Sequence, residues 1–363
     1  MAVAEGGATT RGDPFLTGLV GILIGLGTFL GLLNYYGDLT GFLWASNRDS
    51  AMVAHLESLA EGPVVLIDGT GHDGQYFFLQ ANDPWLLEAD QGIRFLDFPT
   101  YRAQRMLYPA LAGLGGILGP PQVLWGLVIA NILAMGAGSW GLGRLAESIG
   151  MSHWLGLAFA LNPGMIFELA IDGGSLLGWA LAVWGLVAVR RQNWMVGAAL
   201  FAGAVLARET MVLVAIGAFT FVWYTERRPR PVLILAPALA GGLWWLFVRR
   251  QLETIPRRTG SETLDVPLRG LWTGLSNWLA TGGLNLALGI LVVFCVVVIV
   301  ASAVRRPSLL SWATIGFVPL LMILHPAVTV GGLNITRAMA PVVSAAVVLV
   351  LGRMAFADRS EKR

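Results

Sequence analysis

Residues 15–33 read FLTGLVGILIGLGTFLGLL, a run without a single charged side chain. About 20 apolar residues are enough for a helix to cross the hydrocarbon core of a bilayer. Comparable runs recur as far as Phe356, with two long polar interruptions. Hydrophobic residues make up 56% of the chain and charged residues only 13%, far from the composition of a soluble domain. The chain is therefore predicted to be an all-α polytopic membrane protein, with residues 1–363 forming a single transmembrane domain.

Ten runs are candidate crossings, and clusters of arginine near their ends orient them. If the ten alternate, the clusters around 190–191, 227–230 and 305–306 fall on one side, which the positive-inside rule makes cytoplasmic. A short apolar piece, Met106 to Gly119, fits this alternation only as a re-entrant or interfacial helix. The ten runs are 15–33, 123–142, 154–171, 175–189, 194–207, 211–224, 232–248, 284–303, 309–324 and 339–356.

Two long segments then lie outside the cytoplasm, a first external loop at 34–105 and a second at 249–283. Within the first, Leu43 to Ala60 has apolar residues at helical spacing and predicts a helix along the membrane surface. The expected location is the plasma (cell inner) membrane, with both termini cytoplasmic and the polar chemistry on the extracytoplasmic face.

Composition and missing motifs exclude several classes of function. A net charge of +2 and the lack of a basic run interleaved with aromatic residues argue against nucleic acid and leave membrane lipid as the expected partner. A single cysteine, Cys295, allows neither an intrachain disulfide nor a thiolate metal cluster. The sequence has no phosphate-binding P-loop, no serine-hydrolase elbow and no zinc-protease helix motif.

The polar stretch 71–77, GHDGQYF, holds the strongest candidate for chemistry. Asp73 lies between Gly71 and Gly74, which permit tight backbone turns and close approach of a substrate, while His72 adds a proton carrier. Asp73 is thus a candidate general base. The alternative is that it merely caps a short helix beginning at Gly74, since aspartate is a favoured N-cap.

Arginines follow in the stretch 101–109, YRAQRMLYP. Arg102 and Arg105 are three residues apart, so one helix face would present two guanidinium groups to a phosphate. The alternative is that both anchor the chain at the membrane interface. Either role places positive charge close to Asp73 in the first external loop.

Further ionisable residues interrupt the apolar runs, where charges are costly and usually line a cavity or pair with each other. Asp172 follows the helix-breaking sequence Asn162-Pro163-Gly164, and Arg208 precedes Glu209, with which a local ion pair is the alternative to a binding role. His325 and Arg337 fall in the last external turn and are interpreted as binding a donor phosphate. The four histidines are too scattered to predict a metal site.

These motifs together resemble the GT-C superfamily of integral-membrane glycosyltransferases, which use polyprenyl-phosphate-linked sugars. The likeness is to the small bacterial branch similar to the mannosyltransferases of the GPI-anchor pathway. The residues that carry it are His72-Asp73-Gly74-Gln75-Tyr76-Phe77, Tyr101-Arg102, Arg105-Met106-Leu107-Tyr108-Pro109, Asn162-Pro163-Gly164 with Asp172, Ala207-Arg208-Glu209-Thr210 and Arg337-Ala338-Met339-Ala340-Pro341.

The resemblance implies transfer of a sugar, a mannose-like hexose, to an acceptor hydroxyl with inversion at the anomeric carbon. Asp73, with His72, would be catalytic, and the acceptor would be an unidentified glycan, lipid or protein. No cofactor is implied as obligatory, although some members of the superfamily hold a divalent metal. The implied donor-phosphate contacts are Arg102, Arg105, Arg208, His325 and Arg337, and the implied substrate contacts are Gln75, Tyr76, Tyr108, Asp172 and Glu209.

Two other classes of function fit parts of the pattern. A transporter or flippase of a lipid-linked sugar would also use arginines and broken helices, but repeated interrupted spans in paired halves are typical of transporters and none is evident. A lipid-binding scaffold without catalysis would need the arginines but not Asp73.

Overall fold

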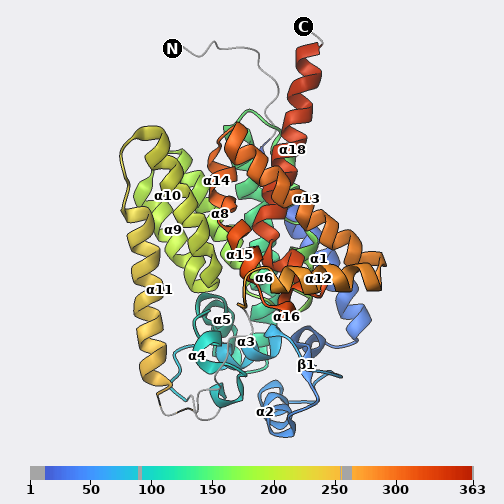
Figure 1. Ribbon diagram of the computed structural model, residues 1–363. Coiled ribbons are helices and arrows are strands. Elements are labelled where there is room, and N and C mark those ends of the chain that lie inside the picture. The colour runs from blue at the N-terminus through green and yellow to red at the C-terminus, as the bar shows by residue number, and fades with distance from the viewer. Residues whose placement is uncertain (1–12, 89–91, 254, 256–263, 362–363) are drawn as a thin grey trace.

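The structure is a computed structural model that describes residues 13–88, 92–253, 255 and 264–361, with side chains described as far as Gly352. Residues 254 and 256–263 of the predicted second external loop therefore lie outside the described residues. The described elements are helices apart from two strands of two residues each (Figure 1). The prediction of an all-α protein is confirmed.

Four described helices are long and apolar enough to cross a membrane: α1 (Pro14–Tyr36), α6 (Gln122–Ser148), α11 (Val232–Gln251) and α13 (Gly283–Arg305). A fifth crossing results if α17 (Gly332–Ala338) and α18 (Ala340–Glu361) are taken as one span, with a bend of 77° between them. The predicted number of ten crossings is therefore wrong.

The remaining predicted crossings are helical but short or broken. Helices α8 (Ser175–Arg190), α9 (Trp194–Ala207) and α10 (Val212–Glu226) have 16, 14 and 15 residues. At 1.5 Å per residue they reach roughly 21–24 Å, against a hydrocarbon core of about 30 Å. The predicted span 154–171 is divided into η4 (His153–Ala158) and α7 (Pro163–Ala170), and 309–324 is divided into α14 (Leu309–Ile315) and α15 (Phe317–Ile323).

A proline explains the first of these breaks. Pro163 has no backbone N–H to donate and is tolerated in the first turn of a helix, so the chain restarts there as α7. The side chain of Asn162 caps the new helix by accepting a hydrogen bond from the backbone N–H of Gly164 at 2.9 Å. A hydropathy pattern alone does not register such a break.

The first predicted loop is a packed assembly of short elements. Its parallel strands β1 (Ala45–Ser46) and β2 (Leu66–Ile67) flank α2 (Ser50–Ala60), which Asp49 caps; the expected surface helix from Leu43 therefore begins later than predicted. The other elements are η1 (Leu39–Leu43), α3 (Asp73–Asn82), η2 (Ile93–Phe95) and α4 (Pro99–Arg102). The short segment after them forms α5 (Leu107–Ala112) and η3 (Gly113–Leu118).

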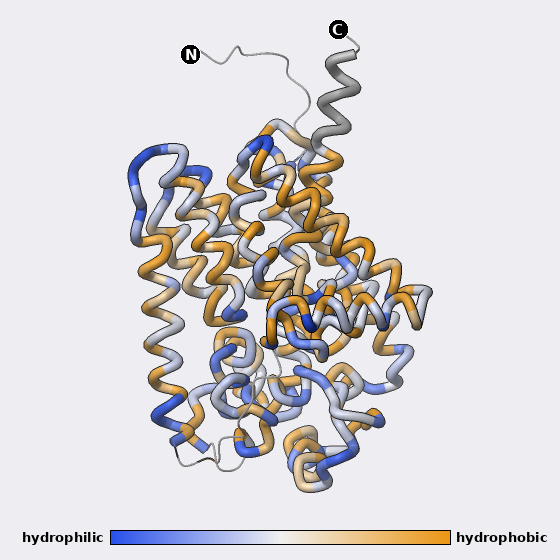
Figure 2. Tube along the Cα trace, in the orientation of Figure 1, coloured by the Kyte–Doolittle hydropathy of each residue, from blue (hydrophilic) through white to orange (hydrophobic). Residues whose placement is uncertain are grey.

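Two separate cores hold these parts together. The larger packs α6, α8, α9, α10, α14 and α18 around fully buried side chains such as Trp179, Phe201 and Phe317. The second packs the first loop against α5 and the start of α6, with Phe78, Leu56 and Tyr108 fully buried. In Figure 2, hydrophobic residues follow the long helices, while hydrophilic residues gather at the helix ends and in the first loop.

Candidate functional site

Asp73 begins helix α3, and its carboxylate points into a cluster of arginines. His72, not Asp73, occupies the N-cap position, so the alternative that Asp73 merely caps the helix is wrong. The carboxylate is buried, with 4% of the residue exposed. Gly74 allows this placement, because a Cβ at that position would lie 2.6 Å from the carbonyl oxygen of Ile171 and 2.7 Å from that of Phe42.

Three arginines from two distant parts of the chain reach this one carboxylate. Arg102 donates a hydrogen bond to Oδ1 of Asp73. Arg337, on α17, donates to Oδ2 at 2.9 Å, and Nη1 of Arg105 lies 3.6 Å from the same oxygen. Helix α4 ends at Arg102, so the prediction that Arg102 and Arg105 share one helix face is wrong. The turn after α4 nevertheless brings both guanidinium groups to Asp73.

Each of these arginines also contacts a second carboxylate. Arg102 makes two hydrogen bonds of 2.8 Å to Asp97. Arg105 makes two of 2.8 Å to Glu209, which begins η5 (Glu209–Met211). Glu209 is thus paired with Arg105. The alternative of a local ion pair between Glu209 and Arg208 is wrong.

Glu168 completes the set of second carboxylates. Nε of Arg337 lies 3.4 Å from Oε1 of Glu168, a fully buried carboxylate on α7. Asp73 is therefore the centre of a network in which three arginines bridge it to three outer carboxylates.

Helix packing places Arg337 and Glu168 in this network. Gly164 in the first turn of α7 permits close contact with α17, because a Cβ there would lie 2.3 Å from the carbonyl oxygen of Thr336. Glu168 accepts hydrogen bonds from the backbone N–H of Ser175 at 2.9 Å and from its hydroxyl at 2.7 Å. The Asn162-Pro163-Gly164 motif therefore has a definite role, which is to let two helices approach and bring Arg337 to Asp73.

The network sets the ionisation of its members. Burial raises the pKa of Asp73, but Arg102, Arg337 and Arg105 outweigh it and hold the pKa well below its usual range. Burial likewise opposes ionisation of Glu209, yet Arg105 and Arg208 lower its pKa to about 2. Burial, with Arg337, lowers the pKa of His72 to about 4. At neutral pH Asp73 and Glu209 are thus ionised and His72 is a neutral imidazole.

Several predicted substrate contacts lie beside the network with partners of their own. The ring of Tyr76 lies 4.7 Å from the guanidinium carbon of Arg102, a cation–π arrangement. The amide oxygen of Gln75 accepts from the backbone N–H of Ser46 at 3.0 Å. The hydroxyl of Tyr108 is fully buried and donates to the carbonyl oxygen of Leu127 at 3.0 Å.

Asp172 and Arg208 are buried near the network without complete hydrogen bonding. Oδ1 of Asp172 and Nη1 of Arg208 have no hydrogen-bond partner among the described residues. Asp172 adopts a left-handed conformation with φ of 46°, and burial raises its pKa well above the usual value. The adjoining Gly173 is needed for space, since a Cβ there would lie 1.9 Å from Oε2 of Glu168. A buried carboxyl and a buried guanidinium thus remain available to a ligand.

His325 is placed elsewhere. Its Nδ1 accepts from the backbone N–H of Ala327 at the start of α16 (Pro326–Thr329), and its Nε2 lies 3.8 Å from a carboxylate oxygen of Asp265. Arg269 lies 3.4 Å from the same oxygen. Within the described part of the chain, no hydrogen bond or ion pair joins His325 to the Asp73 network.

The sequence alone assigns no role in the site to Glu168 or Tyr101. Glu168 is the one acidic residue in the apolar run 154–171, and a buried charge in such a run is a usable signal. The hydroxyl of Tyr101 donates to Glu209 at 3.2 Å, a contact that nothing in its local sequence indicates. Asp97, which also lies in the first predicted loop, is a partner of Arg102.

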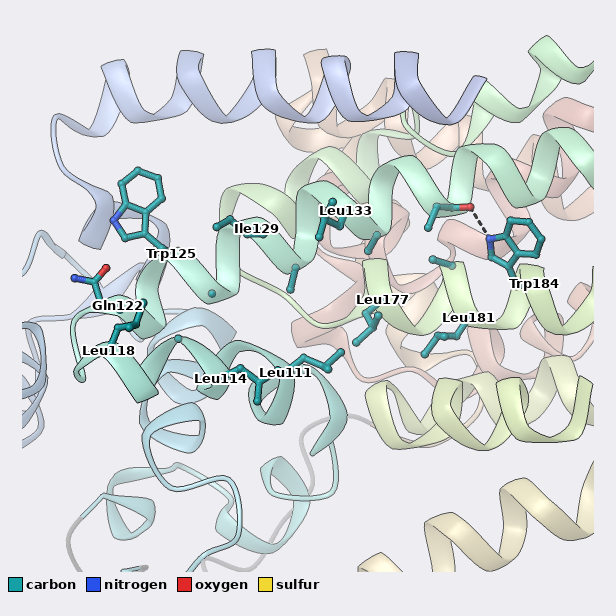
Figure 3. A pocket seen from close by; sticks show the side chains of 16 residues that line it. Leu111, Leu114, Leu118, Gln122, Trp125, Ile129, Leu133, Leu177, Leu181 and Trp184 are labelled. Atoms are coloured by element: carbon teal, nitrogen blue, oxygen red, sulfur yellow. Dashed lines mark hydrogen bonds between the residues drawn. The ribbon is translucent and has the colours of Figure 1, made fainter. Parts of the chain in front are cut away.

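An apolar groove lies between α5 with η3 on one side and α6 and α8 on the other (Figure 3). Its volume is about 610 Å³, and its lining includes Leu111, Leu114, Leu133, Leu177 and Leu181. Two of the helices that line it are connected to the charged site along the chain. Helix α5 begins shortly after Arg105, and α8 begins at Ser175, whose hydroxyl donates a hydrogen bond to Glu168. No group of three or more metal-binding side chains that could hold an ion is found among the described residues.

Comparisons with protein families, with curated proteins and with solved structures found no match for this chain.

Proposed function

We propose that this protein is an inverting glycosyltransferase of the membrane that moves a sugar, a mannose-like hexose, from a polyprenyl-phosphate donor to an acceptor hydroxyl. The observation that carries the proposal is the convergence of Arg102, Arg105 and Arg337 on the Asp73 carboxylate. Such a set supplies both elements of the reaction. Guanidinium groups bind the phosphate that leaves, and a carboxylate accepts the proton of the attacking hydroxyl.

The proposed reaction is a single displacement. The acceptor oxygen attacks the anomeric carbon, its proton passes to Asp73, and the bond between that carbon and the phosphate oxygen breaks. The electron pair of the broken bond leaves with polyprenyl phosphate, whose developing charge the arginines stabilise. Because a lipid phosphate is already a good leaving group, positioned positive charge and one base account for much of the catalysis.

The ionisation of Asp73 in the free protein gives the order of events. With three arginines nearby its pKa is well below the usual range, so Asp73 is a weak base before a donor arrives. A phosphate that draws the guanidinium groups toward itself removes that stabilisation and raises the pKa of Asp73. Under this proposal, donor binding activates the base. His72, the preceding residue, has a pKa lowered to about 4 and is a neutral imidazole beside Asp73 in the chain.

The groove supports a lipid-linked donor. Its leucine and alanine lining suits a hydrocarbon chain, and it lies on the elements that lead into the charged site. We propose that the polyprenyl chain lies in this groove with its phosphate at the arginines. Tyr76, Asp172 and Glu209 are the proposed sugar and acceptor contacts around them.

The distribution of basic residues supports an extracytoplasmic site. The turn between α10 and α11 carries Arg227 and Arg228, and the turn after α13 carries Arg305 and Arg306. Both turns lie at the end of the molecule opposite α3 and α4 (Figure 1). By the positive-inside rule those turns are cytoplasmic, and the Asp73 network faces the other side.

The test is turnover by purified protein in lipid nanodiscs supplied with polyprenyl-phosphate sugars and cell-envelope extract, followed by mass spectrometry. The native protein and the control Asp265→Asn should release polyprenyl phosphate, while Asp73→Asn should bind the donor without turnover. Full turnover by Asp73→Asn would contradict the proposed mechanism. Movement of intact donor across a bilayer without release of polyprenyl phosphate would instead identify a transporter.

A further inference from the structure

Helix α12 (Arg269–Thr281) has three distinct faces, and the first is buried against the protein. Its buried residues are Gly270, Gly274 and Trp278. The indole N–H of Trp278 donates to the carbonyl oxygen of Thr329 at 2.9 Å, and the hydroxyl of Thr329 donates to that of Gly270 at 2.6 Å. Gly270 has no room for a side chain, since a Cβ would lie 1.9 Å from the carbonyl oxygen of Leu324. The helix is therefore fixed in orientation.

The second face is apolar and exposed. Leu268, Trp272, Leu275 and Leu279 are 54%, 72%, 40% and 64% exposed. Trp272, Leu275 and Leu279, three and four residues apart, share one narrow stripe of the helix, and Leu268, the N-cap residue, is exposed just before it. An exposed stripe of this size, including a tryptophan, indicates an interaction surface.

The third face is polar and flanks the stripe. Thr273 and Ser276 lie on it, each donating its hydroxyl hydrogen to the carbonyl oxygen four residues earlier. Arg269 shares this flank, with 67% of its side chain exposed. Taken in order around the helix, the faces are protein, apolar and polar, which is the arrangement of a helix at a boundary between hydrocarbon and water.

Helix α12 continues directly into a candidate membrane span, and this identifies what covers the stripe. Gly282 and Gly283, with φ of 59° and 52°, turn the chain from α12 into α13. Leu284, at the start of α13, is 65% exposed, and Phe294 further along it is 54% exposed, so the apolar surface passes from one helix to the next. In Figure 1, α12 lies roughly horizontally, whereas the candidate span α11 runs from top to bottom of the view.

We infer that α12 lies in the membrane interface, with the stripe of Trp272, Leu275 and Leu279 in the lipid and the flank of Arg269, Thr273 and Ser276 in water. Hydrocarbon that covers the exposed side of α13 also covers the adjoining stripe. Leucine and tryptophan on one side of such a helix, beside polar residues, are typical of interfacial anchors.

The placement has a consequence for the charged site. The buried face of α12 packs on α16, which is followed by α17 with Arg337. In addition, Oδ1 of Asn285 on α13 accepts from the backbone N–H of Gly332 at 3.0 Å. The interfacial helix thus sets the depth of α17 in the bilayer, and this holds whether or not the proposed glycosyl transfer is correct.

The experiment measures the depth of single spin labels in protein reconstituted in phosphatidylcholine nanodiscs. Cys295→Ala supplies a background without cysteine, and Trp272→Cys or Leu279→Cys labels the stripe while Thr273→Cys or Ser276→Cys labels the flank. Oxygen concentrates in lipid, whereas the nickel chelate stays in water. The ratio of collisions with oxygen to collisions with the chelate should be severalfold higher for stripe labels than for flank labels. Val297→Cys in α13 serves as a reference within the bilayer.

Two results would overturn the inference. One is equal access of the nickel chelate to stripe and flank labels, which would place both in water. The other is dipolar broadening between stripe labels of neighbouring copies, which would identify the occupant as a second copy of the chain. All four labelled positions have accessible side chains, and Ala280→Cys offers a further exposed flank position if one variant fails to fold.

Discussion

Asp73 and Asp265 both face two or more basic residues, and their surroundings differ. Asp73 is buried, and its cationic partners come from α4, the turn after it and a helix 264 residues away in the chain. Among the described residues, Asp265 pairs with Arg269, four residues along, and with His325, and the side chain of Arg269 is 67% exposed. The first cluster joins distant parts of the chain around a buried carboxylate, whereas the second has a carboxylate that is 11% exposed beside an arginine that is open to solvent.

This difference teaches where electrostatics matter for function. An exposed pair is screened and contributes about 0–1 kcal/mol, while removal of one partner from a buried network costs about 3–5 kcal/mol, because the other charges stay buried without compensation. A protein that keeps such a network despite this possible loss of stability is expected to use the site in its function. Asp73, rather than Asp265, is therefore the place to look for chemistry.

The largest expected effect tests this contrast directly. Asp73→Ala leaves three guanidinium groups without their shared carboxylate, and we expect a loss of about 3–5 kcal/mol in stability. Asp265→Ala should cost less than about 1 kcal/mol. Denaturant unfolding in detergent, followed by tryptophan fluorescence, compares the two. Equal losses would remove the distinction between the clusters.

Removal of Glu168 should have the next largest effect. Glu168→Ala deprives Ser175 of an acceptor for two hydrogen bonds and Arg337 of an ionic partner, so we expect a loss of about 2–4 kcal/mol. Glu147→Ala is the matched control, since its pair with Arg144 is partly exposed and 4.0 Å long. If the two variants unfold at the same denaturant concentration, Glu168 is not part of the supporting network.

Stability should also fall as pH falls, through His72. Its pKa in the folded protein is about 4, below the ordinary 6.5, so the folded state binds fewer protons than the unfolded state between these values. The contribution of neutral His72 is complete above about pH 6.5 and is lost as pH falls toward about 4, with a cost on the order of 1 kcal/mol near pH 5.5.

The control for this pH effect is His72→Asn, which cannot titrate in that range. The melting temperature of the native protein should drop between pH 7 and pH 5.5 more than that of the variant, in the same detergent. Parallel curves for the two proteins would assign the pH dependence to other groups.

The smallest effect is expected at the second cluster. His325→Asn removes the contact with Asp265 at 3.8 Å, and the amide can still cap α16 by accepting from Ala327. We expect a change of less than about 0.5 kcal/mol in stability and no loss of turnover. A large loss of turnover would instead connect His325 to the donor phosphate, as its sequence position suggested.

The sequence by itself determined the class of fold and the identity of most charged residues in the site. In a bilayer, a single long apolar run can satisfy its backbone N–H and C=O groups only by forming a helix. The prediction of an all-α protein was therefore correct, although the predicted number of crossings was not. Asp73 stands out by its flanking glycines, Arg102 and Arg105 by their spacing of three residues, and Arg337 because charge beside an apolar run is costly.

The tertiary structure alone decided which charges meet. Pro163 marks a break in the sequence itself, whereas the break at Gly316 is evident only in the structure, and the two turn two predicted crossings into pairs of short helices. Arg337 meets Asp73 because Gly164 lets α7 and α17 approach, and Glu209 pairs with Arg105 rather than with its neighbour Arg208. Such contacts link residues more than a hundred positions apart. They depend on the packing of whole helices, which hydropathy and spacing along one chain do not encode.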